Sequence, residues 1–267
     1  MDRCPGPAAG TGPWRRGGGG RRKVTDLDVA LTDFAITVEC GAFALANAKR
    51  ARSPLRDALT AVFVLTAFAS ASGGAVHGFT PDPASVGYRV MWPATLLAIV
   101  AASAALGFAA LDLLGAHPRL RTAVWVVAMG FGTAIVSGAQ SFGVAIGAYV
   151  PASLWLAYAL ATNYRSTRAK RAACGSAGLL LGIVAGGLQQ LAYTPMPGRL
   201  DPNAFYHLLQ MLTLAMIYVA GAVRRPSPSD GGVAGNDRGD VVGSAALQRK
   251  IDERAAGRLG TARRAED

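Results

Sequence analysis

The sequence predicts an all-α, polytopic membrane protein built as a bundle of seven transmembrane helices. The chain of 267 residues is 51% hydrophobic but only 16% charged, whereas soluble domains have about 25% charged residues. Five long blocks contain no Asp, Glu, Lys or Arg, namely residues 58–81, 90–111, 122–164, 172–198 and 204–223. A helix needs roughly 20 apolar residues to cross a bilayer. Each block is therefore long enough for one crossing, and the longest for two.

These blocks, with an apolar stretch that follows residue 28, divide the chain into three parts. Residues 1–28 are rich in Gly, Pro and Arg and are predicted to be a disordered tail. Residues 29–223 form the membrane domain, and residues 224–267 a disordered cytoplasmic tail, in which Leu247, Ile251 and Leu259 predict a weak amphipathic helix. The predicted spans are 29–47, 58–79, 90–114, 122–137, 142–163, 172–193 and 204–223.

The first span is expected to stay in the mature protein. It contains Asp33 and Glu39, which the apolar region of a secretory leader does not tolerate. A leader cleaved after Ala48 is the alternative, because the preceding residues resemble a cleavage site.

The net charge of +11 is explained by the distribution of the basic residues. Twelve Lys or Arg lie in the first, third and fifth loops and just after the last span, whereas the other loops hold Arg89 and Arg199. Basic residues gather on the cytoplasmic side of membrane proteins. We therefore expect a multi-pass protein of the cell membrane, with its N-terminus outside and its C-terminus in the cytoplasm. No aromatic residues alternate with a basic surface, so nucleic acid is not an expected partner.

Several polar side chains are predicted to lie at one depth, near the outer ends of four spans. At about 1.5 Å per residue, Asp33, His77 and His207 lie within ~6 Å of those ends. Gln189 and Gln190 lie at a similar depth at the end of the sixth span. Ionisable groups inside a membrane are costly and often mark function. The alternative is that they only form hydrogen bonds between neighbouring helices.

The helical phases of these residues agree with a shared pocket. In the second span one stripe carries Thr66, Ser70, Gly73 and His77, and in the first span one stripe carries Asp33, Thr37, Cys40, Ala44 and Asn47. In the last span Gln210 follows His207 by three residues and shares its face, and Asn203 precedes it by one turn. The predicted pocket residues are thus Ser70, Gln189, Gln190, Asn203 and Gln210, beside the two histidines.

Three further features have simpler interpretations. Glu39 is predicted near mid-membrane, either as a proton-handling or ligand-facing group or as a neutral acid bonded to a neighbour. Asp112 and His117 are expected to be interfacial residues at the inner side. The GxxxG pairs at Gly143/Gly147, Gly178/Gly182 and Gly182/Gly186 indicate close helix packing.

The seven spans, the Ser/His stripe SASGGAVH ending at His77 and the segment NAFYH ending at His207 resemble the alkaline-ceramidase and adiponectin-receptor-like superfamily. Glu39 followed by Asn47 is similar to the first helix of the ceramidases. The resemblance implies a zinc ion held by histidines and the hydrolysis of lipid amides. The match is partial, because the family's serine falls on Gly73, the first histidine of its pair in the seventh span falls on Asn203, and no aspartate lies in the outer half of the third span.

Two functions are compatible with these residues. The first is a metal-dependent hydrolase of a lipid amide or ester, in which His77 and His207 bind zinc, and Asp33 or Glu39 completes the site or activates water. The second is a non-catalytic sensor, binding or assembly protein without metal. A transporter has less support, because internal repeats are not evident. Membrane lipid is the expected partner in the first case.

Overall fold

The computed structural model describes residues 22–223, and this part of the chain is entirely helical outside its connections. The seven helices are α1 (Arg22–Ala48), α2 (Pro54–Phe79), α3 (Val86–Leu114), α4 (Pro118–Val136), α5 (Phe142–Thr167), α6 (Lys170–Gln190) and α7 (Pro202–Ala220). All seven are long and apolar enough to cross a membrane. The predicted seven-span fold is confirmed. Residues 1–21 and 224–267, with the predicted disordered tails and the amphipathic segment, lie outside the described residues.

The helix ends differ from the predicted spans where polar residues continue or cap a helix. α1 begins at Arg22, so residues 22–28, which we predicted to be part of the tail, are helical. Hydropathy predicts only the part of a helix that lies in the membrane. The helical hydrogen bonds of the backbone can continue beyond it into water, so the helix is longer than the predicted span. α2 and α7 begin at Pro54 and Pro202, after Ser53 and Asp201 accept backbone N–H bonds of the first turn.

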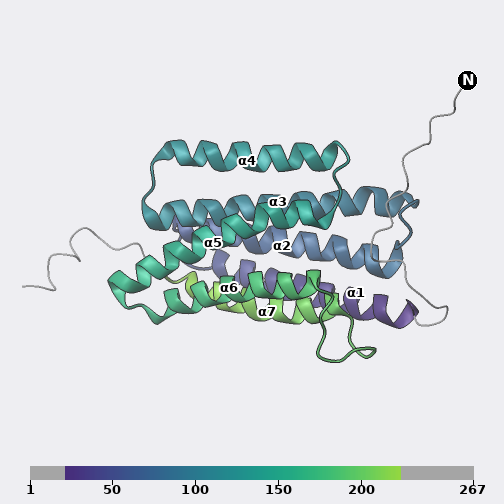
Figure 1. The fold of residues 1–267 in the computed structure, drawn as a ribbon. Helices are drawn as coiled ribbons and strands as arrows, with labels where there is room; N and C mark the ends of the chain where they lie inside the picture. The colour runs from purple at the N-terminus through teal and green to yellow at the C-terminus, as the bar shows by residue number, and fades with distance from the viewer. Residues whose placement is uncertain (1–21, 224–267) are drawn as a thin grey trace, which may run out of the picture. The chain divides into compact units, whose positions relative to one another are not determined.

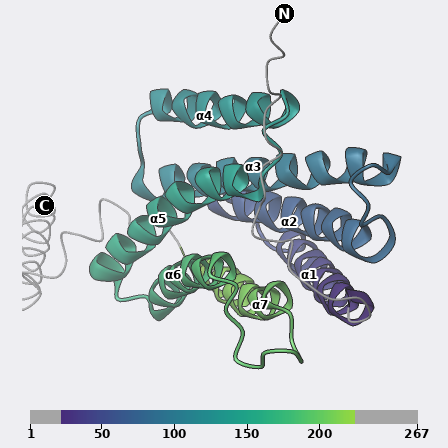
Figure 2. The same ribbon diagram turned by 45° about the vertical axis from the view of Figure 1, so that its right-hand side comes forward.

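Six of the helices form a closed ring. In order around the ring, α1 packs against α2, α2 against α3, α3 against α5, α5 against α6, α6 against α7, and α7 against α1. α4 lies outside the ring and packs mainly against α3, as Figures 1 and 2 show. On α4 only Ile135 is buried, where it meets Leu96 and Val100 of α3 and Ala145 of α5. The seven spans are therefore a ring of six helices with one peripheral helix.

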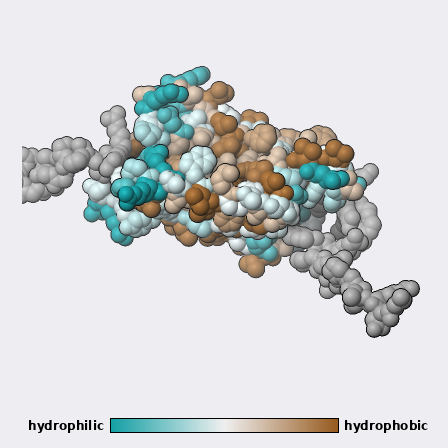
Figure 3. Space-filling model, turned by 90° about the horizontal axis from the view of Figure 1, so that it is seen from above, coloured by the Kyte–Doolittle hydropathy of each residue, from teal (hydrophilic) through white to brown (hydrophobic). Residues whose placement is uncertain are grey.

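The α4 side of this helical unit is mostly apolar, as expected of a surface that faces hydrocarbon. Trp125, Val126 and Met129 of α4 are each more than half exposed. In Figure 3 hydrophobic residues extend along this face, and hydrophilic residues gather mainly towards the left. An apolar surface of this length belongs to a helix bundle that is embedded in a bilayer.

The ring has two distinct ends. We call the end with the connections 49–53, 115–117 and 168–169 the core end, and the end with the connections 80–85, 137–141 and 191–201 the pocket end. At the core end the ring is filled by a large cluster of buried apolar side chains, among them Ile36, Phe63, Leu113, Leu160 and Ile217. The same helices separate enough at the pocket end to leave a cavity.

α6 and α7 approach closely because α6 carries glycine where they meet. A Cβ atom built on Gly178 would lie 2.6 Å from the Cβ atom of Met216, and one built on Gly182 would lie 3.0 Å from Thr213 Cγ2. The packing predicted for Gly178 and Gly182 is therefore observed. Gly186 differs, because a Cβ atom there would meet nothing within 4 Å. The two helices are in tight contact below the cavity and separate along its side.

The two interfacial residues lie at the core end. Asp112 near the end of α3 forms an ion pair with Arg121 of α4. His117 is exposed, and its Nδ1 atom accepts a hydrogen bond from the Arg119 backbone N–H at the start of α4. Both residues therefore tie α4 to the turn that precedes it.

Candidate functional site

A cavity of about 570 Å³ occupies the pocket end of the ring. All six ring helices and the connection 137–141 contribute to its lining, whereas α4 contributes no side chain among the described residues. The lining includes the exposed residues Gln140 and Gln190, so the cavity is open at the pocket end. Its other end lies against Val62, Leu106 and Ile217 of the apolar cluster.

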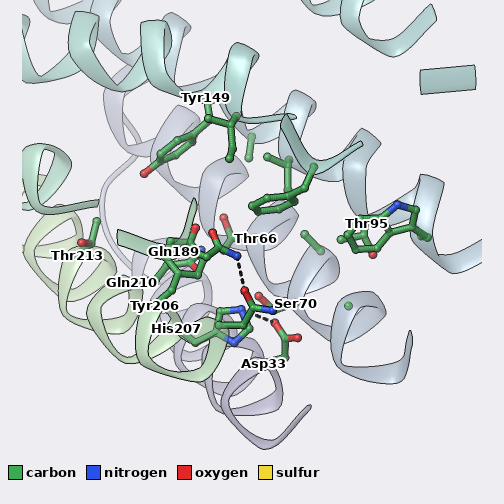
Figure 4. A pocket seen from close by; sticks show the side chains of 18 of the residues that line it. Asp33, Thr66, Ser70, Thr95, Tyr149, Gln189, Tyr206, His207, Gln210 and Thr213 are labelled. Atoms are coloured by element: carbon green, nitrogen blue, oxygen red, sulfur yellow. Dashed lines mark hydrogen bonds and ion pairs between the residues drawn. The ribbon is translucent and has the colours of Figure 1, made fainter. Parts of the chain in front are cut away.

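The centre of the site is a pair of buried side chains, Asp33 of α1 and His207 of α7. The Nε2 atom of His207 lies 3.5 Å from the Oδ1 atom of Asp33, and the two side chains are 11% and 7% exposed. Figure 4 shows the two residues facing each other beside Ser70. The separation exceeds that of an ordinary N–H···O hydrogen bond, which is about 2.9 Å. The pair is close enough to share one ligand atom.

Thr32 orients the histidine ring. Its hydroxyl lies 2.9 Å from His207 Nδ1 and 3.0 Å from the backbone carbonyl oxygen of Val29. If the hydroxyl donates to this carbonyl, it accepts from Nδ1–H, which leaves the Nε2 lone pair directed at Asp33. If it donates to Nδ1 instead, Nε2–H points at the carboxyl group. The second arrangement places an exchangeable proton between Asp33 and His207, next to the cavity, and the first does so when the Asp33 carboxyl group is protonated.

Glycines on α2 make room for Asp33. A Cβ atom built on Gly74 would lie 3.0 Å from Asp33 Cβ and 3.3 Å from the Ala30 carbonyl oxygen, and one built on Gly73 would lie 3.4 Å from Asp33 Oδ2. A larger residue at 74 would therefore separate α1 from α2. Gly73 stands where the resemblance would place a serine, and here the Asp33 carboxyl group lies against that position.

The predicted stripe of α2 faces the cavity as a whole. Thr66, Ser70, Gly73 and His77 all contribute to its lining. His77 also lies within electrostatic reach of His207. The two histidines that were expected to share a pocket therefore do line one cavity, from α2 and α7.

The amide side chains lie at the junction of α6 and α7. Gln189 Nε2 donates to Asn203 Oδ1 at 2.7 Å, which joins the end of α6 to the start of α7. The other polar atom of this amide, Gln189 Oε1, is buried and has no hydrogen-bond partner among the described residues. Gln190 and Gln210 also line the cavity. The five predicted pocket residues, Ser70, Gln189, Gln190, Asn203 and Gln210, thus all lie on its wall.

Glu39 is the predicted site residue that does not line the cavity. It follows Asp33 by six residues, and at about 100° per residue its side chain leaves α1 on a different face. One of its carboxyl oxygens, Oε2, is buried without a hydrogen-bond partner among the described residues. The geometry therefore leaves Asp33 as the carboxylate of the site.

Sequence reasoning missed Thr32, Tyr149, Tyr206 and Thr213. Tyr149, Tyr206 and Thr213 line the cavity, and Thr213 is only 1% exposed although its hydroxyl has no partner among the described residues. Figure 4 shows Tyr206 next to Gln189 and Gln210. Helical phase could have placed Thr213 beside Gln210, which precedes it by three residues, but not on the face of His207, from which it is about 120° away. Nothing local to Thr32 predicts its bond, which depends on how α1 meets α7.

The residues present supply part of a metal site. Ligand atoms at about 2.0–2.1 Å from a tetrahedral zinc ion lie about 3.4 Å apart, and Asp33 Oδ1 and His207 Nε2 are separated by 3.5 Å. In the described part of the chain, no group of three or more His, Cys, Asp or Glu side chains is arranged to hold a metal ion. The site offers two ligands at a suitable separation, and His77 lies on the same cavity.

Seven apolar helices, six of them around a cavity with polar groups on its wall, are typical of a multi-pass membrane protein. The chain belongs to the family of unknown function DUF6962, whose model matches residues 29–226. That range covers all seven helices from Val29 onwards. No curated protein and no solved structure matches the chain.

Proposed function

We propose that this protein binds a small lipid-like molecule in the cavity, and that Asp33 and His207 receive the polar group of that molecule. The observation that carries the proposal is the buried Asp33–His207 pair on the wall of an open cavity. Polar residues that serve helix packing bond to one another across a filled interface. Here Ser70 and Gln210 line about 570 Å³ of space instead.

The lining also indicates the charge of the bound group. Among the described residues it contains carboxyl, imidazole, amide and hydroxyl groups, but no Lys or Arg. A phosphate or carboxylate group is most often received by such cationic side chains. The first turns of α5 and α7, at Phe142 and Asn203, also line the cavity, but a helix N-terminus carries only a partial positive charge. Neutral groups that both donate and accept hydrogen bonds, such as hydroxyl and amide groups, are the better match.

Binding can be tested with lipids that share one chain but differ in the head group. The probes are a fatty alcohol, an N-acylethanolamide, a fatty acid and a lysophosphatidylcholine, each added to the full-length protein in phosphatidylcholine nanodiscs. We expect the two neutral probes to raise the thermal unfolding midpoint, because a ligand that binds only the folded state stabilises it. Asp33→Asn should weaken this binding by about fivefold, the effect of losing one hydrogen bond of about 1 kcal/mol.

Asp112→Asn is the matched control, because the same change is made at a carboxylate outside the cavity. It should bind the neutral probes like the wild type. If none of the four probes binds, or if Asp33→Asn and Asp112→Asn behave alike, the proposed binding function fails.

The Asp33–His207 separation supports a second candidate, a metal-dependent hydrolase of lipid amides or esters. Asp33, His207 and a reoriented His77 would be the ligands, a two-histidine and one-carboxylate set. A bound zinc ion would supply an activated water molecule for hydrolysis. Thr32 would hold the His207 ring, and the cavity wall would position the amide or ester group.

Metal content separates the two candidates. Elemental analysis of purified protein should find stoichiometric zinc in the wild type and in His117→Ala, and none in His77→Ala or His207→Ala, if the site is a zinc site. His117 is the remaining histidine of the chain and lies outside the cavity. The zinc-dependent hydrolase is ruled out if the wild-type protein binds lipid but contains no stoichiometric metal after incubation with zinc.

We further infer that the core end faces the cytoplasm. Ten Lys or Arg lie in the core-end connections or in the first and last turns of the helices beside them, whereas four, Arg22, Lys23, Arg89 and Arg199, lie near the pocket end. In a cysteine-free background, a cysteine at position 194 should react with an impermeant reagent added to intact cells. A cysteine at position 168 should not, and its labelling from outside would reverse the orientation.

A further inference from the structure

The cavity is long. Along α7 it extends from Asn203 to Ile217, about 21 Å at 1.5 Å per residue, and along α3 from Tyr88 to Leu106, about 27 Å. This length is enough for an extended hydrocarbon chain that lies along the bundle axis.

The polarity of the wall changes along this length. Near the pocket end the lining includes His77, Gln189, Asn203 and the Asp33–His207 pair, beside the aromatic rings of Trp92 and Phe142. At the opposite end it consists of Val62, Leu106, Leu214 and Ile217, which belong to the apolar cluster of the core end. Hydroxyl groups, such as that of Thr213, lie between the two zones. An occupant with one polar end and one apolar end would match this gradient in a single orientation.

Resting on the proposed function, we propose that the ligand is a single-chain amphiphile, with its head at Asp33 and His207 and its tail along the bundle axis against Leu106 and Ile217. The distance from His207 to Ile217, ten residues along α7, is about 15 Å. An extended alkyl chain rises about 1.25 Å per carbon atom, so this distance accommodates about 12 carbon atoms. The apolar side chains at this end of the cavity, which we call the floor, therefore limit the length of the bound chain. We call this limit the ruler.

The floor can be lowered without changing the head-group site. Leu106 of α3 is 1% exposed and lines the cavity, so Leu106→Ala should lengthen the tail region by about two carbon atoms. Leu113 lies seven residues further on the same helix, and is 6% exposed in the same apolar cluster, but does not line the cavity. Leu113→Ala thus removes the same atoms from the same core and serves as the matched control.

The test uses N-acylethanolamides that differ only in the length of their saturated chain, with the full-length protein in phosphatidylcholine nanodiscs. For the wild type we expect the tightest binding near about 12 carbon atoms and a loss of about tenfold for chains that are too long, because overfilling a closed space strains it. Leu106→Ala should shift this optimum to longer chains, and Leu113→Ala should leave it in place. Asp33→Asn should weaken binding at every chain length without moving the optimum.

The ruler and the proposed function can fail separately. If amides of all lengths bind equally and Asp33→Asn weakens them, the binding function stands and the single-chain ruler is wrong. The ruler is also wrong if Leu106→Ala and Leu113→Ala have the same chain-length profile. If no amide of any length binds the wild type, the proposed ligand class falls together with the ruler.

Discussion

The two ends of the ring use the same six helices but fill the space between them differently. At the core end, Phe63, Leu113 and Leu160 are almost fully buried in one apolar cluster. At the pocket end, Asp33, Ser70 and His207 are just as inaccessible, yet they surround a cavity. A bundle in lipid gains little from hiding apolar surface, so its stability depends on close packing. The comparison indicates that the core end holds the bundle together and the pocket end is where a ligand can bind.

The largest expected effect comes from removing a core-end side chain. Phe63 of α2 is fully buried, and Phe63→Ala should lower the free energy of unfolding in a bilayer by about 2 kcal/mol, the cost of the cavity alone, because transfer of the ring into lipid costs little. Ser70→Ala, seven residues further on the same helix, should change it by less than about 0.5 kcal/mol. Steric-trapping measurements of unfolding would compare the two. Equal losses would contradict the division into a core end and a pocket end.

A smaller effect is expected at the glycines of α6. Gly178→Ala should destabilise the protein by about 1.5 kcal/mol, because the new Cβ atom would lie 2.6 Å from that of Met216. Gly186→Ala adds the same methyl group where nothing lies within 4 Å, and should be neutral or slightly stabilising. The same unfolding measurement applies. If Gly186→Ala is as harmful as Gly178→Ala, α6 and α7 are in contact along the whole of their length.

The smallest effects distinguish two threonines of the pocket end. Thr32→Val removes the hydroxyl that bonds to His207 Nδ1, and should cost about 1 kcal/mol because a buried ring nitrogen loses its partner. Thr213→Val removes a buried hydroxyl that has no partner among the described residues, so it should leave stability unchanged or raise it by up to about 1 kcal/mol. A loss of more than about 1 kcal/mol for Thr213→Val would show that its hydroxyl is bonded in the membrane.

Much of the fold and part of the site follow from the sequence alone. The five charge-free blocks determine six helices and the apolar stretch after residue 28 a seventh, because a backbone in hydrocarbon must satisfy its hydrogen bonds within each segment. Helical periodicity places Thr66, Ser70 and His77 on one face of α2, and the cost of polar groups in lipid turns that face inward. Depth and helical phase therefore suffice to assign His77, His207 and the amide residues to one pocket.

The tertiary structure decided what lies between the helices. Periodicity gives the direction of a side chain relative to its own helix axis, but not which neighbour it meets or at what height. The exclusion of α4 from the ring, the bond from Thr32 to His207 and the position of Glu39 outside the cavity all depend on how pairs of helices pack. So does the cavity itself, because it lies between six helices whose separation depends on how each pair packs.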